Sequence, residues 1–145
     1  MNETVIQRPH WSFWLIGVVG LSWYLMGTAN FLAQLSPEFV ASMPETHRTI
    51  IESRPLWATF SFGIAVIIGV LGCLLLIRRR DIAFYMFVVS LIAVIVTLGP
   101  FLHLIGTTIT DPFEIFMMVV TSPLVAVFLI WYTRFAESRA WLNKF

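Results

Sequence analysis

The segment from residue 56 to residue 77, LWATFSFGIAVIIGVLGCLLLI, sets the class of fold. It contains no charged residue, and a helix needs about 20 such residues to cross the ~30 Å hydrocarbon layer of a bilayer. Further apolar runs cover about 12–34, 82–105 and 113–133. The sequence therefore predicts an all-α integral membrane protein, with four spanning helices bundled in a single domain, 1–145.

The composition agrees with this class. Of the 145 residues, 59% are hydrophobic and 12% charged, and the mean hydropathy is +0.87, whereas a soluble domain has about 25% charged residues. The formal net charge of +1 gives no basic surface of the size that nucleic-acid binding needs. These values exclude soluble enzyme folds, and we expect the lipid bilayer, not nucleic acid, as a partner.

The basic residues predict the orientation of the chain. Only Arg48 and Arg54 fall on one side of the four runs, and the other seven Lys and Arg residues fall on the opposite side. Because cytoplasmic loops are enriched in Lys and Arg, we expect both termini in the cytoplasm of a cell with an inner membrane, and 36–55 outside as a short helical loop. Three arginines in the turn between the second and third runs are candidates for contacts with anionic lipid headgroups: Arg78, Arg79 and Arg80.

Polar residues near the predicted outer ends of the runs form a candidate site. Asn30, Gln34 and Glu38 are four residues apart, which places them on one helical face if the first helix continues through the loop. Three more polar residues are expected at a similar depth: His103, Asp111 and Glu114. Together the six residues predict a polar vestibule for a hydroxylated solute, a headgroup or a metal ion.

Each of these residues also has a structural interpretation. The amides of Asn30 and Gln34 suit hydrogen bonds between helices, Asp111 and Glu114 suit a helix start, and His103 suits the end of a helix. No pair of His or carboxylate residues on one predicted helix has metal-ligand spacing. We therefore predict no resident metal and no cofactor.

Small residues and prolines carry further expectations. Ala65, Gly69 and Cys73 lie four residues apart, a stripe that allows another helix to approach closely. We expect the chain to pack through this stripe with itself or with other membrane proteins. Pro100 and Pro123 should bend the third and fourth helices, and such bends either open a cavity or only shape the bundle.

The sequence also bears on catalysis. It has no nucleophile paired with a base, no paired acids and no glycine-rich phosphate loop on an ordered element. We therefore expect this protein not to be an enzyme.

A resemblance to known proteins rests on four segments: Trp23 to Asn30 (WYLMGTAN), Pro37-Glu38, Pro55 to Phe62 (PLWATFSF) and Gly69 to Gly72 (GVLG). In these segments the chain resembles small bacterial four-span proteins that are often labelled "sugar transporter", and in size it is similar to the DoxX-like proteins. The resemblance implies a bacterial inner-membrane protein and favours transport.

Two functions follow from these observations. The first is a non-catalytic accessory or interaction protein that packs against other membrane proteins. The alternative is a small-solute carrier, for example for sugars, or a binder of lipophilic ligands, acting as a dimer.

Overall fold

The fold is that of four long helices and several short ones, in a computed structural model that describes residues 5–144. The long helices are α1 (Trp11–Gln34), α4 (Leu56–Ile77), α5 (Ala83–Leu102) and a fourth that begins with α6 (Pro112–Ile115). The fourth continues through a π-helical turn, η1 (Phe116–Val120), into α7 (Thr121–Ser138). All four are long and apolar enough to cross a membrane. The expected all-helical fold is confirmed over the described residues, with four helices of the length and apolar composition that a span requires.

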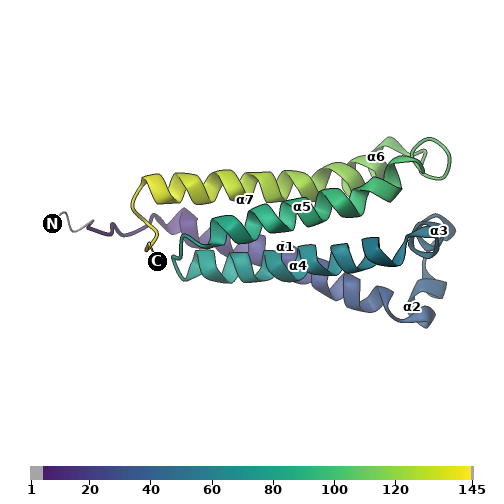
Figure 1. Ribbon diagram of the computed structural model, residues 1–145, viewed down its shortest axis with the longest axis horizontal. Helices are drawn as coiled ribbons and strands as arrows, with labels where there is room; N and C mark the ends of the chain where they lie inside the picture. Colours follow the sequence, from purple (N-terminus) through teal and green to yellow (C-terminus); the bar gives the residue numbers. More distant parts are fainter. Residues whose placement is uncertain (1–4, 145) are drawn as a thin grey trace.

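The long helices lie side by side (Figure 1). α4 packs against α1 and α5, and α5 packs against α7. α1 and α7 meet in one half of the molecule, where the Phe13 and Tyr132 ring centroids are 6.4 Å apart and Gly20 faces Leu129. The described termini and the turn between α4 and α5 lie at this end, called the terminal end below (Figure 1).

The opposite end carries α2 (Pro37–Ser42), α3 (Glu45–Ser53) and the loop 103–111, and is called the α3 end below (Figure 1). The two short helices match the predicted helical loop. Ile50 of α3 is only 4% exposed and lies beside Pro100 and Phe101 of α5. α3 therefore covers this end of the long helices, because its apolar side chains are turned toward them.

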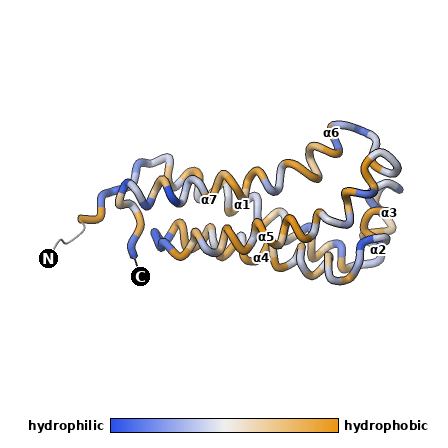
Figure 2. The backbone as a smooth tube through the Cα atoms, turned by 45° about the horizontal axis from the view of Figure 1, so that its top comes forward, coloured by the Kyte–Doolittle hydropathy of each residue, from blue (hydrophilic) through white to orange (hydrophobic). Residues whose placement is uncertain are grey.

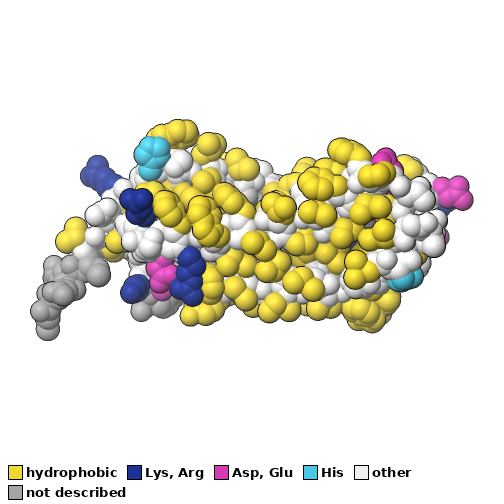
Figure 3. Space-filling view, turned by 90° about the horizontal axis from the view of Figure 1, so that it is seen from above, with side chains coloured by type: hydrophobic (Ala, Val, Ile, Leu, Met, Phe, Trp, Pro, Cys, Tyr) yellow, Lys and Arg dark blue, Asp and Glu magenta, His cyan; other side chains and the backbone are white. Residues whose placement is uncertain are grey.

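The surface is divided along the molecule. Hydrophobic residues dominate the middle of all four long helices, and hydrophilic residues gather at the two ends (Figure 2). In the space-filling view, Lys and Arg lie toward the terminal end, and Asp and Glu are seen at both ends (Figure 3). A broad apolar belt between polar ends is the surface expected of a multi-pass membrane protein.

Two predicted boundaries are corrected. The third helix ends at Leu102 instead of residue 105; Pro100 lacks an N–H and weakens the last turn, and the chain then enters a loop in which Gly106 has φ 86°. The fourth helix runs to Ser138 instead of 133, since Tyr132, Thr133 and Ala136 continue its buried face.

Candidate binding site

A pocket of about 540 Å³ lies toward the α3 end, bounded by α1, α3, α4, α5, η1 and the first turn of α7. This volume falls in the range of small-molecule sites, about 300–1,000 Å³. Most of the lining is apolar, and it includes Trp23, Met26, Val66, Val94, Leu98 and Met118. The pocket separates α1 from η1, so the two helices that meet at the terminal end are apart here.

Tyr24 closes the pocket on the side of the terminal end. Its ring lies directly over Gly69 of α4, where a Cβ atom would overlap it, and it stacks on Phe87 with centroids 6.4 Å apart. The Ser90 hydroxyl donates to the Ala65 carbonyl at 2.8 Å and lies 3.4 Å from the Tyr24 hydroxyl. Because the Ser90 proton is used by the carbonyl, the Tyr24 hydroxyl is the donor in the second bond. The Tyr24 side of the pocket is thus held in place by contacts among α1, α4 and α5.

Arg54, between α3 and α4, is the charged group of the pocket. Its Nη2 donates to Oε1 of the Gln34 side-chain amide at 2.8 Å, and its Nε donates to the Thr59 hydroxyl at 3.2 Å. The guanidinium also lies 5.6 Å from the centroid of the Phe62 ring. Among residues 5–144 no carboxylate forms an ion pair with Arg54, and burial lowers the pKa of its guanidinium.

His47 of α3 also lines the pocket. Its Nδ1 atom is buried and has no hydrogen-bond partner among the described residues. A buried polar atom without a partner is unfavourable by about 1–3 kcal/mol. His47 is therefore available to a bound molecule that brings a polar group to this side of the pocket.

The π-helical turn η1 forms the opposite edge. The Thr121 N–H donates to the Phe116 carbonyl, a bond that spans five residues instead of four. Pro123 has no N–H to donate to the Val119 carbonyl, as an α-helical residue would. The wider π-helical turn just before it accommodates the missing hydrogen bond. Met117 and Met118 of η1 line the pocket together with Ser122. The segment before Pro123 therefore borders a cavity; the sequence left open whether this proline would open a cavity or only shape the bundle.

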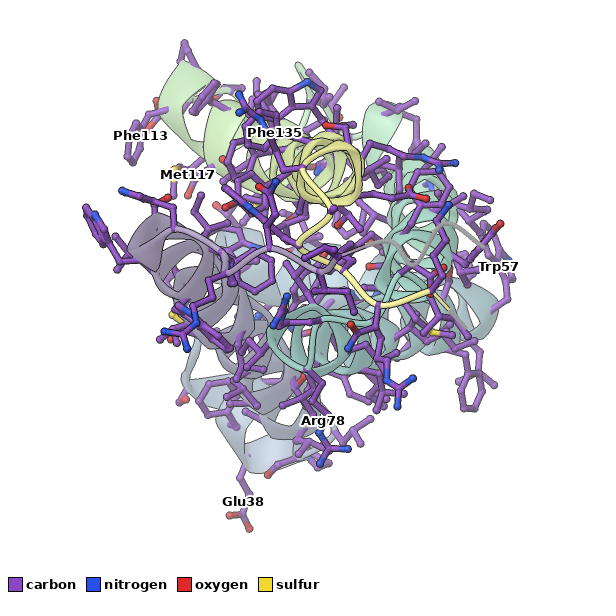
Figure 4. All side chains as sticks on the ribbon, turned by 90° about the vertical axis from the view of Figure 1, so that its left-hand side faces the viewer. Glu38, Trp57, Arg78, Phe113, Met117 and Phe135 are labelled. Carbon is purple, nitrogen blue, oxygen red and sulfur yellow. The ribbon has the colours of Figure 1, made fainter. Side chains whose placement is uncertain are left out.

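The six residues of the predicted vestibule do not come together. Asn30 and Gln34 line the pocket, but α1 ends at Gln34, and a turn at Leu35 and Ser36 separates it from α2. Glu38 is consequently not on their face; it is exposed and points away from the helices (Figure 4). The shared face required that the first helix continue through the loop; this condition is not met, because Pro37 starts a new helix.

The other three vestibule residues lie outside the pocket. His103 is exposed at the end of α5, and Asp111 caps α6 by accepting from the Phe113 N–H at 3.0 Å. Glu114 lies in the first turn of α6 and does not line the pocket. Asp111 therefore acts as a helix cap, which was the structural interpretation predicted for it as an alternative to the vestibule.

The small-residue stripe is buried inside the chain. Ala65, Gly69 and Cys73 of α4 are all buried; Gly69 faces Tyr24, and Cys73 faces Gly20 of α1. The small side chains of the stripe allow α4 to pack closely against α1. Because the stripe is covered within the chain, it is not available to a second chain. The expectation that other proteins bind through it is therefore corrected, and any such contact would use another face.

The three arginines of the turn between α4 and α5 differ from one another. Arg78 is exposed, and Arg80 makes interactions within the chain. Arg79 has φ 61°, its Nε donates to the Trp141 carbonyl at 2.7 Å, and its Nη2 donates to the Gln7 carbonyl at 2.9 Å. Arg79 thus binds both chain ends to the turn, whereas Arg78 and Arg80 are both exposed.

Sequence reasoning missed Arg54, His47 and Met118 as pocket residues. Arg54 was used only for the orientation, although a basic residue directly before a long apolar run is a usable signal. No local pattern indicated His47 or Met118. The position of His47 depends on how α3 packs on the long helices, and that of Met118 depends on the π-helical turn.

Comparison of the chain with protein-family models, curated proteins and solved structures finds no match. The helices and the pocket establish what kind of protein this is at a coarse level: a multi-pass, all-helical membrane protein with a mainly apolar pocket near one end. The resemblance to the small four-span proteins stays a prediction.

Proposed function

We propose that this protein is a non-catalytic membrane protein that binds a lipophilic or amphipathic small molecule in the pocket. The observation that carries the proposal is the pocket itself, about 540 Å³ with an apolar lining and a few polar groups gathered at one end. This distribution is typical of sites that take up apolar molecules and orient them by few polar contacts.

The edges of the pocket support entry from the bilayer. Met26 of α1 is 63% exposed and Met117 of η1 is 45% exposed, and both line the pocket. Seen along the helices, Met117 lies on the side where α1 and the segment containing η1 are neighbours (Figure 4). Flexible Met side chains adapt to varied apolar shapes, so this edge suits a ligand that arrives from the lipid.

The terminal half favours binding over passage. Phe13, Leu76, Phe87 and Leu129 are at most 1% exposed and fill the space between the helices there. A solute crossing the protein would have to displace these side chains and the Tyr24 contacts. We accordingly rank a carrier second, and an accessory role remains compatible with ligand binding.

We also propose that both termini lie in the cytoplasm of a cell with an inner membrane, as the distribution of Lys and Arg predicts. The pocket would then lie in the outer half of that membrane. A ligand of the outer leaflet or of the external space would reach it directly.

Native mass spectrometry tests the proposal. The protein is extracted from its membrane in a mild neutral detergent, and retained small molecules are measured for wild type and for Met118→Trp, which places a larger ring in the pocket. Val127→Trp is the matched control, because Val127 lies on the same span with 52% of its surface exposed. We expect a retained molecule in wild type and control and its loss in Met118→Trp; equal retention in all three would place the ligand elsewhere, and no retention in any would refute the proposal.

A further inference from the structure

We infer that the ligand is an amphipathic anion, whose phosphate or carboxylate binds Arg54 and whose hydrocarbon lies among the apolar side chains of the pocket. This inference rests on the proposed function, since it names the chemical class of the molecule bound there.

The charge of the pocket is one-sided. Arg54 lines it, and the lining residues include no Asp or Glu among the described part of the chain. A guanidinium that is partly removed from water is unfavourable unless a negative group accompanies it. An anionic ligand supplies the charge that the protein lacks at this place.

The donors of Arg54 are only partly used. A guanidinium has five N–H groups in a planar fork, and within residues 5–144 two hydrogen bonds are formed, to Gln34 and Thr59. These bonds fix the orientation of the plane and leave N–H groups for a bidentate contact, which carboxylates and phosphates match. Gln34 and Thr59 thus act as positioning residues for the guanidinium.

Other polar groups can add to the same anion site. Asn30 lies one turn before Gln34 on α1 and offers an amide N–H₂, and His47 Nδ1, which has no hydrogen-bond partner within residues 5–144, offers a further nitrogen. Neutral polyols are a poorer match, because the wall between Arg54 and Tyr24 is formed mostly by Val66, Leu98 and other apolar side chains.

The depth of Arg54 fits an interfacial headgroup. It precedes α4, which contains no charged residue, by one residue, Pro55. Arg residues at span ends lie at the level of lipid headgroups, and the pocket continues from there toward Tyr24, in the apolar part of the molecule. The polar and apolar parts of a single-chain amphiphile would therefore find matching surroundings in the correct order.

Two lipids that differ only in the phosphate test the inference: 1-lauroylglycerol 3-phosphate and 1-monolauroylglycerol. Each is titrated into the purified full-length protein in neutral detergent, and bound lipid is counted by native mass spectrometry. We expect wild type to bind the phosphate lipid at least about tenfold more tightly. Arg54→Gln should lose this preference but still bind monolauroylglycerol, which shows that its pocket is intact.

Arg48→Gln is the matched control, since Arg48 lies on α3 and does not line the pocket; it should keep the preference. Arg54→Lys, which retains the positive charge, should keep a reduced preference. Inorganic phosphate is titrated separately to distinguish a soluble anion from a lipid.

The outcomes separate the two proposals. Equal binding of both lipids by wild type, or an unchanged preference in Arg54→Gln, overturns the anion inference while the pocket proposal stands. If inorganic phosphate binds in an Arg54-dependent way and the two lipids bind equally, the ligand is a soluble anion. This result overturns the inference that the ligand is amphipathic. Failure of wild type to bind either lipid, together with no retained molecule in the native extract, refutes the proposed function itself.

Discussion

Gly69 sets how closely α1 and α4 approach, because the Tyr24 ring occupies the space where its side chain would be. Tyr24 cannot move away freely, since Phe87 stacks on it and Ser90 holds its hydroxyl. The sequence predicted the small-residue stripe to which Gly69 belongs. In the structure, α5 brings the Ser90 hydroxyl to the Tyr24 hydroxyl, at the buried end of that ring.

Gly69→Ala should lower the free energy of unfolding by about 1–3 kcal/mol, the usual effect of overpacking a filled core. The measurement is thermal unfolding in detergent. Gly99→Ala is the control, because no atom lies within 4 Å of the Cβ position there; it should be neutral or stabilising by up to about 1 kcal/mol. Equal melting temperatures for the two variants would contradict the close packing at Gly69.

Arg79 is the residue that holds the chain ends at the terminal end. Arg79→Gln removes the bonds to the Trp141 and Gln7 carbonyls, and we expect amide hydrogen exchange in 140–144 to accelerate by about tenfold or more. The exposed Arg78 provides the control, and Arg78→Gln should leave this exchange unchanged. Unchanged exchange in both variants would show that Trp141 and its neighbours are held by other contacts.

Among the elements, the fourth helix differs most from a regular span. The sequence predicted a bend at Ser122 and Pro123, since proline removes a helical hydrogen bond, but it did not predict the π-helical turn before it. A helix can accommodate a proline by a kink or by a wider turn, and the local sequence does not decide between the two. A short helical loop was expected over 36–55, and α2 and α3 form it, whereas the covering of the pocket by α3 depends on long-range packing.

Pro123→Ala should convert η1 to regular α-helix, because an alanine at this position has a backbone N–H that can donate to the Val119 carbonyl. Loss of the proline should raise the melting temperature, since proline within a helix is unfavourable by about 3 kcal/mol. Retention of the native small molecule should fall, because Met117 and Met118 turn relative to the pocket. Pro100→Ala in α5 is the control: a stabilised protein with full retention is expected, and a loss of ligand in this variant equal to that in Pro123→Ala would contradict the role of η1.

For the molecule as a whole, apolar run lengths predicted the four spans well, because the bilayer imposes a length on each helix. The candidate site was predicted less well. Asn30 and Gln34 were found by their helical spacing, but Glu38 was lost where the chain turns, and Arg54 and His47 entered the pocket from a segment whose position no local pattern specifies. Sites built from several elements depend on contacts that single-sequence patterns do not contain.

The orientation of the molecule can be tested with two introduced cysteines. Thr107 in the loop at the α3 end and Ser138 at the end of α7 are both exposed, and the native Cys73 is buried. In intact cells a membrane-impermeant maleimide should label Thr107→Cys and not Ser138→Cys, because we propose the α3 end outside. Labelling of Ser138→Cys alone would reverse the orientation and place the pocket in the cytoplasmic half.

The pocket between α1 and η1 is proposed to hold a molecule taken from the bilayer, and photo-crosslinking can locate that molecule. The full-length protein, in lipid bilayers, is crosslinked with a lauroylglycerol phosphate that carries a diazirine on its chain, and the modified peptides are mapped. We predict crosslinks concentrated on residues 23–34 and 117–122, removed by excess unmodified lipid. Crosslinks spread evenly over the exposed apolar belt, at residues such as Ile92 and Ile95, and insensitive to competing lipid would contradict binding in the pocket.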